Sequence, residues 1–271
     1  MAALITLTTD FGTRDPYVAE MKAVILRVNP VVRLIDVTHD IAPHDVLEGG
    51  LAVEAVTAVC PEGTIHVGVV DPGVGTRRRG LVIAAGGQFF VGPDNGIFTT
   101  VLSLPGRQVF ELRNRTYRLS TVSATFHGRD VFGPAAAHLS LGVAPATFGP
   151  PVDDPVRLGW AAPREVAGGV EGEVIHVDRF GNLITSIDGR TVARLSRAGG
   201  AVTVLAGRRM PLVRTYGELN AGRAGALVGS HGRLEVVVRE GNAAARLRAG
   251  RGAPVRVSRS TTSSPSGRKR S

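Results

Sequence analysis

The chain has 271 residues and a formal net charge of +9, with 43% hydrophobic and 20% charged residues. This composition is in the range of a soluble globular protein with a substantial core. The single cysteine, Cys60, excludes an intrachain disulfide and an all-cysteine metal site, and no apolar stretch is long enough to span a membrane. We therefore expect a cytoplasmic protein, without membrane association, that forms one large domain or two domains of ordinary size.

The positive charge raises the question of nucleic-acid binding, because basic surfaces attract phosphates. Much of the excess charge lies from Arg246 onward, and the terminal segment SRSTTSSPSGRKRS is too poor in apolar residues to form a core. The other arginines are scattered among glycine and alanine, without a basic stripe interleaved with aromatic residues. We expect a solvated basic surface, no nucleic-acid partner, and a disordered basic tail at 259–271.

The first half of the chain alternates between strand and helix patterns. Short apolar runs predict strands, and apolar residues at helical spacing predict helices that end near signals such as Pro30. The expected strands cover 4–10, 32–39, 64–71, 81–87, 89–93 and 108–113, and the expected helices cover 16–30, 45–60, 95–104 and 129–141. Strands separated by helices favour an α/β domain with a mainly parallel sheet, to which we assign residues 1–150.

The pattern changes after about residue 150. Residues 151–168 are rich in proline and lack periodicity, which indicates a linker. Residues 169–258 contain short apolar runs separated by glycine and polar turns, with little helical periodicity. This pattern predicts a smaller all-β domain with a barrel-like architecture.

Three predicted strands carry a carboxylate at their C-terminal ends: Asp10 ends the first, the segment Asp36–His39 lies at the end of the second, and Asp71 ends the third. In open α/β sheets, ligands bind outside the carboxyl ends of the strands. A single aspartate at a strand end more commonly caps the following turn or helix. Three such residues at one edge of a sheet indicate a functional site.

Asp71 begins the segment DPGVGTRRRG, which lacks the spacing of a phosphate-binding loop or of a dinucleotide-binding loop. Gly73 and Gly75 instead predict a tight turn that returns the chain, so that one of the arginines 77–79 faces Asp71. A carboxylate held by arginine in a crevice stays ionised and oriented. The alternative is a surface salt bridge of little energetic consequence.

His127 lies in TFHGRD at the start of a predicted helix, where its ring could reach a neighbouring strand end. His39, Asp40, His44 and Asp45 also lie close together in the sequence. Their segment THDIAPHD lacks the helical spacing of a zinc site, so we expect no metal there.

Six ordered motifs make a more specific argument. They are TTDFGTRDPYV, DVTHDIAPHDVLEGG, VVDPGVGTRRRGL, VGPDNGIFT, TFHGRDVF and HVDRFGNLITSI. Together they resemble the S-adenosyl-L-methionine hydroxide adenosyltransferase family, which hydrolyses S-adenosylmethionine to adenosine and is related to fluorinating and chlorinating adenosyltransferases. The resemblance runs from about residue 4 to about residue 248, and it implies an α/β domain followed by a barrel-like domain.

The resemblance also implies the residues of a site. The catalytic set falls on Asp71, Arg78 and His127, of which Asp71 or His127 would be the base. The implied substrate-binding residues are Asp10 for the ribose hydroxyls, Phe126 and Tyr216 for the sugar or adenine faces, Asn182 for the adenine edge, and Asp178, Phe180, Ser230, Glu235 and the backbone of Val238 for the remaining substrate groups. The family implies a homotrimer with sites between subunits, and the reaction requires no cofactor or metal.

The function that this reading predicts is in-line attack of activated water or hydroxide on C5′ of S-adenosylmethionine, which gives adenosine and L-methionine. Two alternatives stay open. A halide-using adenosyltransferase would lack the charged set and would carry an extra loop before VGPDNG, where this chain is short. A non-catalytic protein that binds S-adenosylmethionine or adenosine would keep Asp10, Asn182 and Ser230 without needing the charged set.

The sequence departs from the family pattern at two positions. The loop that holds His44 lacks an aromatic residue that the family often has, and His231 stands where the halogenating relatives carry arginine. For Phe126, Phe180 and Tyr216, the residues alone leave ordinary core packing as an alternative role.

Overall fold

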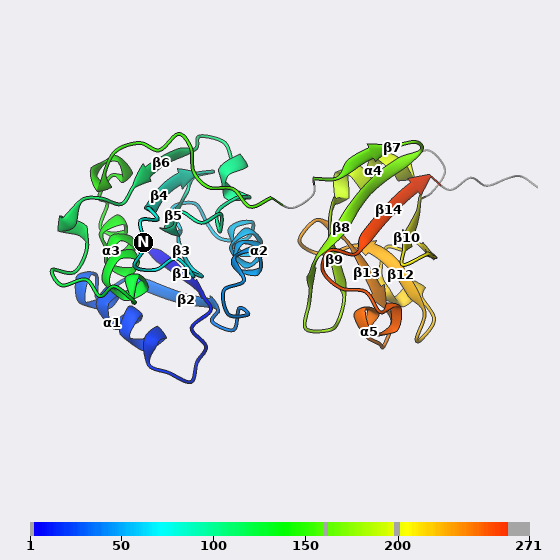
Figure 1. The fold of residues 1–271 in the computed structure, drawn as a ribbon, viewed down its shortest axis with the longest axis horizontal. Coiled ribbons are helices and arrows are strands. Elements are labelled where there is room, and N and C mark those ends of the chain that lie inside the picture. The colour runs from blue at the N-terminus through cyan, green and yellow to red at the C-terminus, as the bar shows by residue number, and fades with distance from the viewer. Residues whose placement is uncertain (1–2, 160–161, 198–200, 260–271) are drawn as a thin grey trace, which may run out of the picture. The chain divides into compact units, whose positions relative to one another are not determined.

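The structure is a computed structural model that describes residues 3–159, 162–197 and 201–259. The chain divides into two compact units, Met1–Leu158 and Gly159–Ser271 (Figure 1). Residues 260–271, which make up most of the tail expected at 259–271, lie outside the described residues. No helix among the described residues is both long enough and apolar enough to cross a membrane.

The first unit is built on a six-stranded sheet with the order β2-β1-β3-β5-β4-β6. Its strands are β1 (Leu4–Thr9), β2 (Arg33–Thr38), β3 (Ile65–Val69), β4 (Gly80–Ala85), β5 (Gln88–Pro93) and β6 (Gln108–Glu111). Strands β2, β1, β3 and β5 pair in parallel, whereas β4 is antiparallel to both of its neighbours. The sheet is therefore mixed, and the expectation of a mainly parallel sheet holds only in part.

The reversal of β4 has a local cause in two glycines. Gly86 and Gly87 have φ angles of 59° and 76° and connect β4 directly to β5, with Ala85 paired to Gln88. A two-residue hairpin turn needs positive φ at both central residues, which glycine adopts without steric cost. The expected strands 81–87 and 89–93 are thus the two arms of one hairpin.

Helices cover both faces of this sheet (Figure 1). They are α1 (Tyr17–Val28), α2 (Val46–Thr57) and α3 (Gly133–Ser140). One core cluster joins α1 and α3 to the face that carries Val82 and Val91. A second cluster joins α2 to the face that carries Ile83 and Phe90. Adjacent residues of a strand point to opposite faces, so α1 and α3 lie on one side of the sheet and α2 on the other.

Two of the expected helices differ from the structure. Residues 95–104 form turns and a short 3-10 helix at Val101–Ser103 instead of an α-helix. The Asn95 side chain accepts the amide of Ile97, and Gly96 has a φ of 96°, so the backbone makes a turn that an α-helix does not allow. The helix expected at 129–141 begins as a π-helical turn, Gly128–Phe132, which continues into α3. The other 3-10 helices are Arg115–Tyr117, Pro145–Phe148 and Tyr216–Glu218.

The second unit is an antiparallel β-structure. Its strands are β7 (Arg164–Val166), β8 (Gly169–Val177), β9 (Leu183–Asp188), β10 (Ala201–Leu205), β11 (Arg208–Pro211), β12 (Ala224–Val228), β13 (Arg233–Val238) and β14 (Pro254–Arg259). The order is β11-β10-β14-β8-β9-β13-β12, with β7 paired to β8. Leu212 bridges to Ala226 just beyond the end of β11, so the two edge strands nearly close the sheet into a barrel. The expected barrel-like architecture is confirmed.

Three elements of the second unit were not predicted. The short helices α4 (Gly189–Ser196) and α5 (Ala243–Leu247) begin at side chains that accept backbone hydrogen bonds, Asp188 and Asn242. Strand β7 lies within the stretch 151–168 that was expected to be a linker, and it pairs with the start of β8.

Candidate functional site

The segment after β3 folds as a tight turn that brings Arg78 back to Asp71. The Val74 amide donates to the Asp71 carbonyl at 3.1 Å, and the Thr76 amide donates to the Gly73 carbonyl at 3.2 Å. The Thr76 hydroxyl also donates to the Gly73 carbonyl, at 2.7 Å. These hydrogen bonds reverse the chain before β4 starts.

Asp71, Arg78 and His127 form one hydrogen-bonded cluster. Arg78 Nε donates to Asp71 Oδ1 at 2.9 Å, and Arg78 Nη2 donates to Asp71 Oδ2. The same Nη2 atom lies 2.7 Å from His127 Nδ1. The Asp71 and Arg78 side chains are only 6% and 12% exposed, so this bidentate pair differs from an exposed surface salt bridge.

The contacts of Arg78 fix the tautomer of His127. A guanidinium group can only donate hydrogen bonds, so His127 Nδ1 must accept one from Arg78 Nη2. The neutral imidazole therefore carries its proton on Nε2. Burial, and then the positive charge of Arg78, lower the pKa of His127 below its ordinary value. The cluster therefore favours a neutral ring whose remaining hydrogen-bonding atom is a donor.

The loop that carries His127 is held by an aspartate that the sequence analysis missed. Asp130 is fully buried, and its carboxylate accepts the Ser123 amide at 2.7 Å and Arg129 Nε at 2.6 Å. Burial alone would raise the pKa of Asp130, but the hydrogen bonds from Arg129 and Ser123 hold it below its ordinary value. Arg129 also donates to Glu20 on α1 at 2.6 Å. The signal was present in the sequence as the adjacent charges after His127-Gly128.

Gly75 joins the Asp71 turn to the loop before His127. It has a φ of 76°, and a Cβ atom at this position would lie 2.4 Å from the carbonyl oxygen of Ala124. The two loops therefore approach each other more closely than any side chain would allow. This contact helps to set the distance between the Asp71 turn and His127.

Asp10 directly follows β1, and its Oδ2 atom accepts the backbone amide of His44 at 3.0 Å. Phe126 lies in an aromatic group, with its ring centroid 5.5 Å from that of Phe11 and 5.3 Å from that of Tyr17. Tyr17 is 45% exposed, so this group reaches the surface rather than filling the core.

The predicted residues of the second unit form a separate polar group. Asp178 Oδ1 accepts the amides of Phe180 and Asn182 at 2.9 and 2.8 Å, and its Oδ2 accepts Asn182 Nδ2 at 2.9 Å. Asn182 Nδ2 also donates to the Tyr216 hydroxyl at 3.3 Å. With both amide hydrogens used, Asn182 Oδ1 is left as the acceptor that the side chain presents. Burial, and then the charge of Asp178, raise the pKa of Glu235 above its ordinary value.

Three further predicted residues fall in different environments. Phe180 is 75% exposed, which makes a core-packing role unsuitable for it. Ser230 lies exposed in the turn between β12 and β13. The Val238 side chain belongs to the barrel core, and its carbonyl accepts the amide of Gly241 at 3.3 Å.

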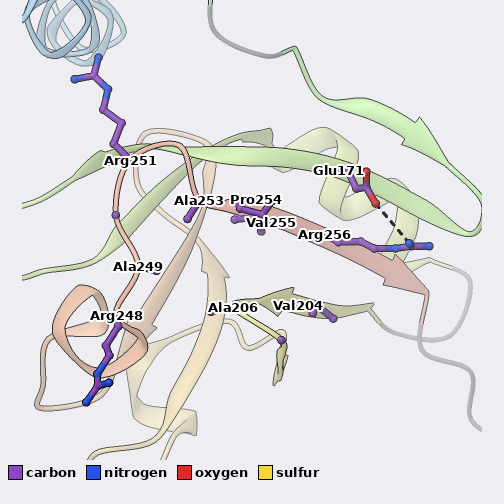
Figure 2. A pocket seen from close by; sticks show the side chains of 12 residues that line it. Glu171, Val204, Ala206, Arg248, Ala249, Arg251, Ala253, Pro254, Val255 and Arg256 are labelled. Atoms are coloured by element: carbon purple, nitrogen blue, oxygen red, sulfur yellow. Dashed lines mark ion pairs between the residues drawn. The ribbon is translucent and has the colours of Figure 1, made fainter.

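A surface hollow of about 510 Å³ on the barrel includes Arg248, Arg251 and Arg256 but none of the predicted site residues. Figure 2 shows that the Arg248 and Arg251 side chains extend in different directions. Arg256 lies 3.5 Å from Glu171 as an ion pair. The three cations do not converge on one point, so this hollow is a poor candidate for an anion site.

Among the described residues, no group of three or more His, Cys, Asp and Glu side chains is arranged to hold a metal ion. Of the four residues weighed for metal binding, His39 contacts Thr9 and Asp36, and Asp45 caps α2 by accepting the amide of Glu48.

Fold and geometry together define a class of protein with an α/β unit, a nearly closed antiparallel barrel, and an Asp–Arg–His cluster at the sheet edge of the α/β unit. Comparison with protein families gives the same two-part division. Residues 5–149 match the SAM hydroxide adenosyltransferase N-terminal domain, and residues 172–256 match the C-terminal domain of that family. The chain belongs to the SAM hydroxide adenosyltransferase family.

Individual relatives agree with this assignment. The (R)-S-adenosyl-L-methionine hydrolase of Thermus thermophilus is 44% identical, over 92% of this chain and 97% of that protein. The protein of the same name from Salinispora tropica is 41% identical, over 89% and 92%. A fluorinase of an Actinoplanes species is 29% identical, over 68% and 71%. An uncharacterised conserved protein from Thermotoga maritima has a similar structure, with a TM-score of 0.87, 32% identity, and coverage of 94% of this chain and 100% of that one.

The contact at Gly75 gives a testable prediction. Gly75→Ala places a Cβ atom 2.4 Å from the Ala124 carbonyl at a positive φ, so we expect it to lower the free energy of unfolding by about 2–3 kcal/mol. Gly12→Ala is the matched control, because Gly12 has a φ of 68° but open space around the added Cβ, and only the backbone strain applies. Urea denaturation measures both variants. Equal losses would show that the approach to Ala124 is unimportant.

Proposed function

We propose that this protein hydrolyses S-adenosylmethionine to adenosine and L-methionine. The observation that carries the proposal is the hydrogen-bonded cluster of Asp71, Arg78 and His127. Membership of the SAM hydroxide adenosyltransferase family and the names of the hydrolases that are 41–44% identical support it.

The chemistry needs a positioned water molecule more than it needs an acid. As the water oxygen bonds to C5′, the C5′–S bond breaks, and its electron pair goes to the sulfonium sulfur, which becomes neutral in methionine. The leaving sulfur develops no negative charge and requires no protonation. Holding the water in line with the C5′–S bond can contribute about 7–11 kcal/mol in well-oriented cases.

The geometry divides the roles within the cluster. His127 Nδ1 accepts from Arg78, so the ring presents Nε2–H, which donates a hydrogen bond to the attacking oxygen and orients it. Asp71 keeps free lone pairs on both carboxylate oxygens, so Asp71 is the proton acceptor in this mechanism. A weak base suffices, because the oxygen becomes strongly acidic once it bonds to C5′. Arg78 holds both partners in place.

The other predicted residues bind the rest of the substrate. Asp10 accepts hydrogen bonds from the ribose hydroxyls, and Phe126 contacts the sugar or adenine. In the second unit, Asn182 Oδ1 accepts the adenine amino group. Tyr216 also contacts the sugar or adenine in this proposal, and the remaining substrate groups are contacted by Asp178, Phe180, Ser230, Glu235 and the backbone of Val238.

The assembly and setting of the enzyme are further parts of the proposal. The family resemblance implies a homotrimer with sites between subunits, and we propose this assembly in the cytoplasm with no cofactor or metal. Light scattering coupled to size-exclusion chromatography measures the number of subunits.

The printed names of the relatives add a stereochemical detail. The hydrolases from Thermus thermophilus and Salinispora tropica are named for (R)-S-adenosyl-L-methionine. Inversion at sulfur moves the methyl and methionine substituents relative to C5′, and only one arrangement places the C5′–S bond in line with a fixed water. We propose that this protein prefers the same sulfonium epimer.

The hydrolysis itself is tested in ¹⁸O-labelled water. We expect labelled adenosine and unlabelled methionine by mass spectrometry. Asp71→Asn and Arg78→Gln should each lower turnover about 10²–10⁴-fold, because they remove the proton acceptor or the group that positions it. Arg77→Gln is the control, because neighbouring Arg77 has no contact with Asp71 or His127 among the described interactions. Unchanged S-adenosylmethionine, or 5′-chloro-5′-deoxyadenosine formed only with added chloride, would contradict hydrolysis.

The pH dependence follows from the state of His127. The active ring is neutral, and its pKa lies below the ordinary value of 6.5, so activity should persist below pH 6.5 and fall as the pH passes through the lowered pKa. Removing the nearby charge in Arg78→Gln should raise the pKa of His127. An NMR titration of the His127 ring measures this pKa in the wild type, in Arg78→Gln and in Arg77→Gln. An equal pKa in all three would contradict the role given to Arg78.

The stereochemical preference has its own test. Separated sulfonium epimers are supplied at equal concentration, and adenosine is measured by liquid chromatography. We expect the kcat/KM for the (R) epimer to exceed that for the (S) epimer by at least about tenfold, because a misaligned C5′–S bond loses the benefit of positioning. Equal values of kcat/KM for the two epimers would show that the site does not distinguish the configuration at sulfur.

A further inference from the structure

The residues before and after Asp10 are both held by hydrogen bonds to His39. The preceding residue, Thr9, is fully buried, and its Oγ1 atom lies 2.8 Å from Nδ1 of His39. The amide of Phe11 donates to the same Oγ1 atom at 3.3 Å, and the amide of Gly12 donates to the His39 carbonyl at 2.7 Å. The segment 9–12 is thus tied to His39 by side chain and by backbone.

The direction of these hydrogen bonds can be assigned. The ring nitrogen of His39 that faces the Asp36 carboxylate can only donate toward it, so the other nitrogen, Nδ1, accepts from the Thr9 hydroxyl, whose Oγ1 in turn accepts from the Phe11 amide. The neutral ring then carries its proton on Nε2. That atom lies 3.0 Å from Asp36 Oδ1. It is poorly aligned for a hydrogen bond and has no other hydrogen-bond partner among the described residues, so its contact with Asp36 is electrostatic.

Asp36 connects this chain of contacts to helix α1. Its second oxygen, Oδ2, accepts Lys22 Nζ at 2.6 Å. Burial opposes ionisation, but the hydrogen bond from Lys22 and the nearby His39 ring keep the pKa of Asp36 below its ordinary value. The chain of contacts therefore runs from Lys22 on α1 through Asp36 and His39 to Thr9, and it ends beside Asp10.

The backbone around these contacts has two irregularities, a register shift and a positive φ angle, of a kind that is common at functional sites. The pairing of β1 with β2 shifts register between Leu7 and Thr8, so that Leu7 is opposite Asp36 and Thr8 is opposite Thr38. Such a bulge changes the direction of the residues that follow it. His44, which donates its amide to Asp10 Oδ2, has a φ of 68°, a conformation that non-glycine residues rarely adopt. Among the described residues, Asp10 Oδ1 has no hydrogen-bond partner.

We propose that His39 is a positioning residue that sets the selectivity for ribose hydroxyls. It fixes the backbone on both sides of Asp10, while the His44 amide holds one carboxylate oxygen. The other oxygen is then directed at the ribose. The inference rests on the proposed function only in assigning the ribose hydroxyls to Asp10. The binding affinity for a ligand without those hydroxyls should not depend on His39.

The first unit offers a closely matched control. His66 on β3 is also buried, and its Nδ1 lies 2.8 Å from Oγ1 of Thr6. Its Nε2 faces Gln88 Oε1 at 2.5 Å, and within the described part of the chain none of this ring's contacts, with Thr6, Gln88 and Phe90, involves Asp10. Removing His66 reproduces the general cost of losing a buried histidine that is bonded to threonine. It leaves the ribose-binding carboxylate in place.

The experiment measures equilibrium binding of adenosine, 2′-deoxyadenosine and 3′-deoxyadenosine by isothermal titration calorimetry. We expect the wild type to prefer adenosine over at least one deoxynucleoside, and His39→Ala to reduce that preference about tenfold, which corresponds to the loss of one well-oriented hydrogen bond to a charged group. His39→Asn keeps a polar atom near the Nδ1 position and should restore part of the preference. His66→Ala should leave the preference at the wild-type value.

Two further measurements keep the outcome decisive. Asp36→Asn changes a residue that is 42% exposed, so it should fold even if His39→Ala does not, and it should lower the ribose preference in the same direction. With S-adenosylmethionine, His39→Ala should raise KM more than it lowers kcat.

Equal loss of affinity for adenosine and both deoxynucleosides, or the same loss of preference in His66→Ala, overturns the inference. A wild type that selects ribose through His39 but produces no adenosine refutes the proposed function and leaves this inference standing.

Discussion

The candidate catalytic cluster depends on one donor-only group, the guanidinium of Arg78. Two of its nitrogens donate hydrogen bonds to the Asp71 carboxylate, and one of these nitrogens donates a further hydrogen bond to Nδ1 of His127. Because arginine cannot accept a hydrogen bond or lose its proton, it determines the states of both partners at once. The carboxylate accepts from the guanidinium through both of its oxygens, and the neutral imidazole keeps its proton on Nε2, the nitrogen away from the pair. A lysine would supply the charge but not the planar fork that reaches both partners.

The cluster also requires that loops from distant parts of the sequence approach closely. Gly75 allows the Asp71 turn to meet Ala124, and Gly128 places the start of the π-helical turn where an added Cβ would lie 2.9 Å from the Phe11 ring. Buried Asp130 then ties this turn to Ser123, and Arg129 within the turn donates to Glu20 on α1. The positions of the reactive side chains therefore rest on backbone contacts and on one buried carboxylate, which limits their freedom before substrate arrives.

The sequence predicts the structure correctly where a local pattern is compatible with only one kind of element. Apolar spacing predicted α1 and α2, and Asp45 was correctly placed at the start of α2 because its side chain accepts a backbone amide there. The turn after Asp71 was predicted from its glycines, although which of three adjacent arginines faces Asp71 came only from the family resemblance. Arg79 instead pairs with buried Asp94. Composition and spacing do not distinguish these neighbours, because their roles depend on which carboxylates the folded turn before β4 brings within reach of each side chain.

The predictions fail where contacts between distant parts of the sequence override the local preference for secondary structure. Residues 95–104 have a helical pattern, but the Asn95 side chain donates to the carbonyl of Val70, which is 25 residues away and outside any local sequence window. The contact between His39 and Thr9 was missed for the same reason, because the two residues are 30 positions apart in the sequence. The two units nevertheless use one device, a carboxylate held by backbone amides, at Asp10 and at Asp178. Fixed donors orient a carboxylate without the reorganisation that water would require, so each of these two carboxylates is held in one orientation by the backbone.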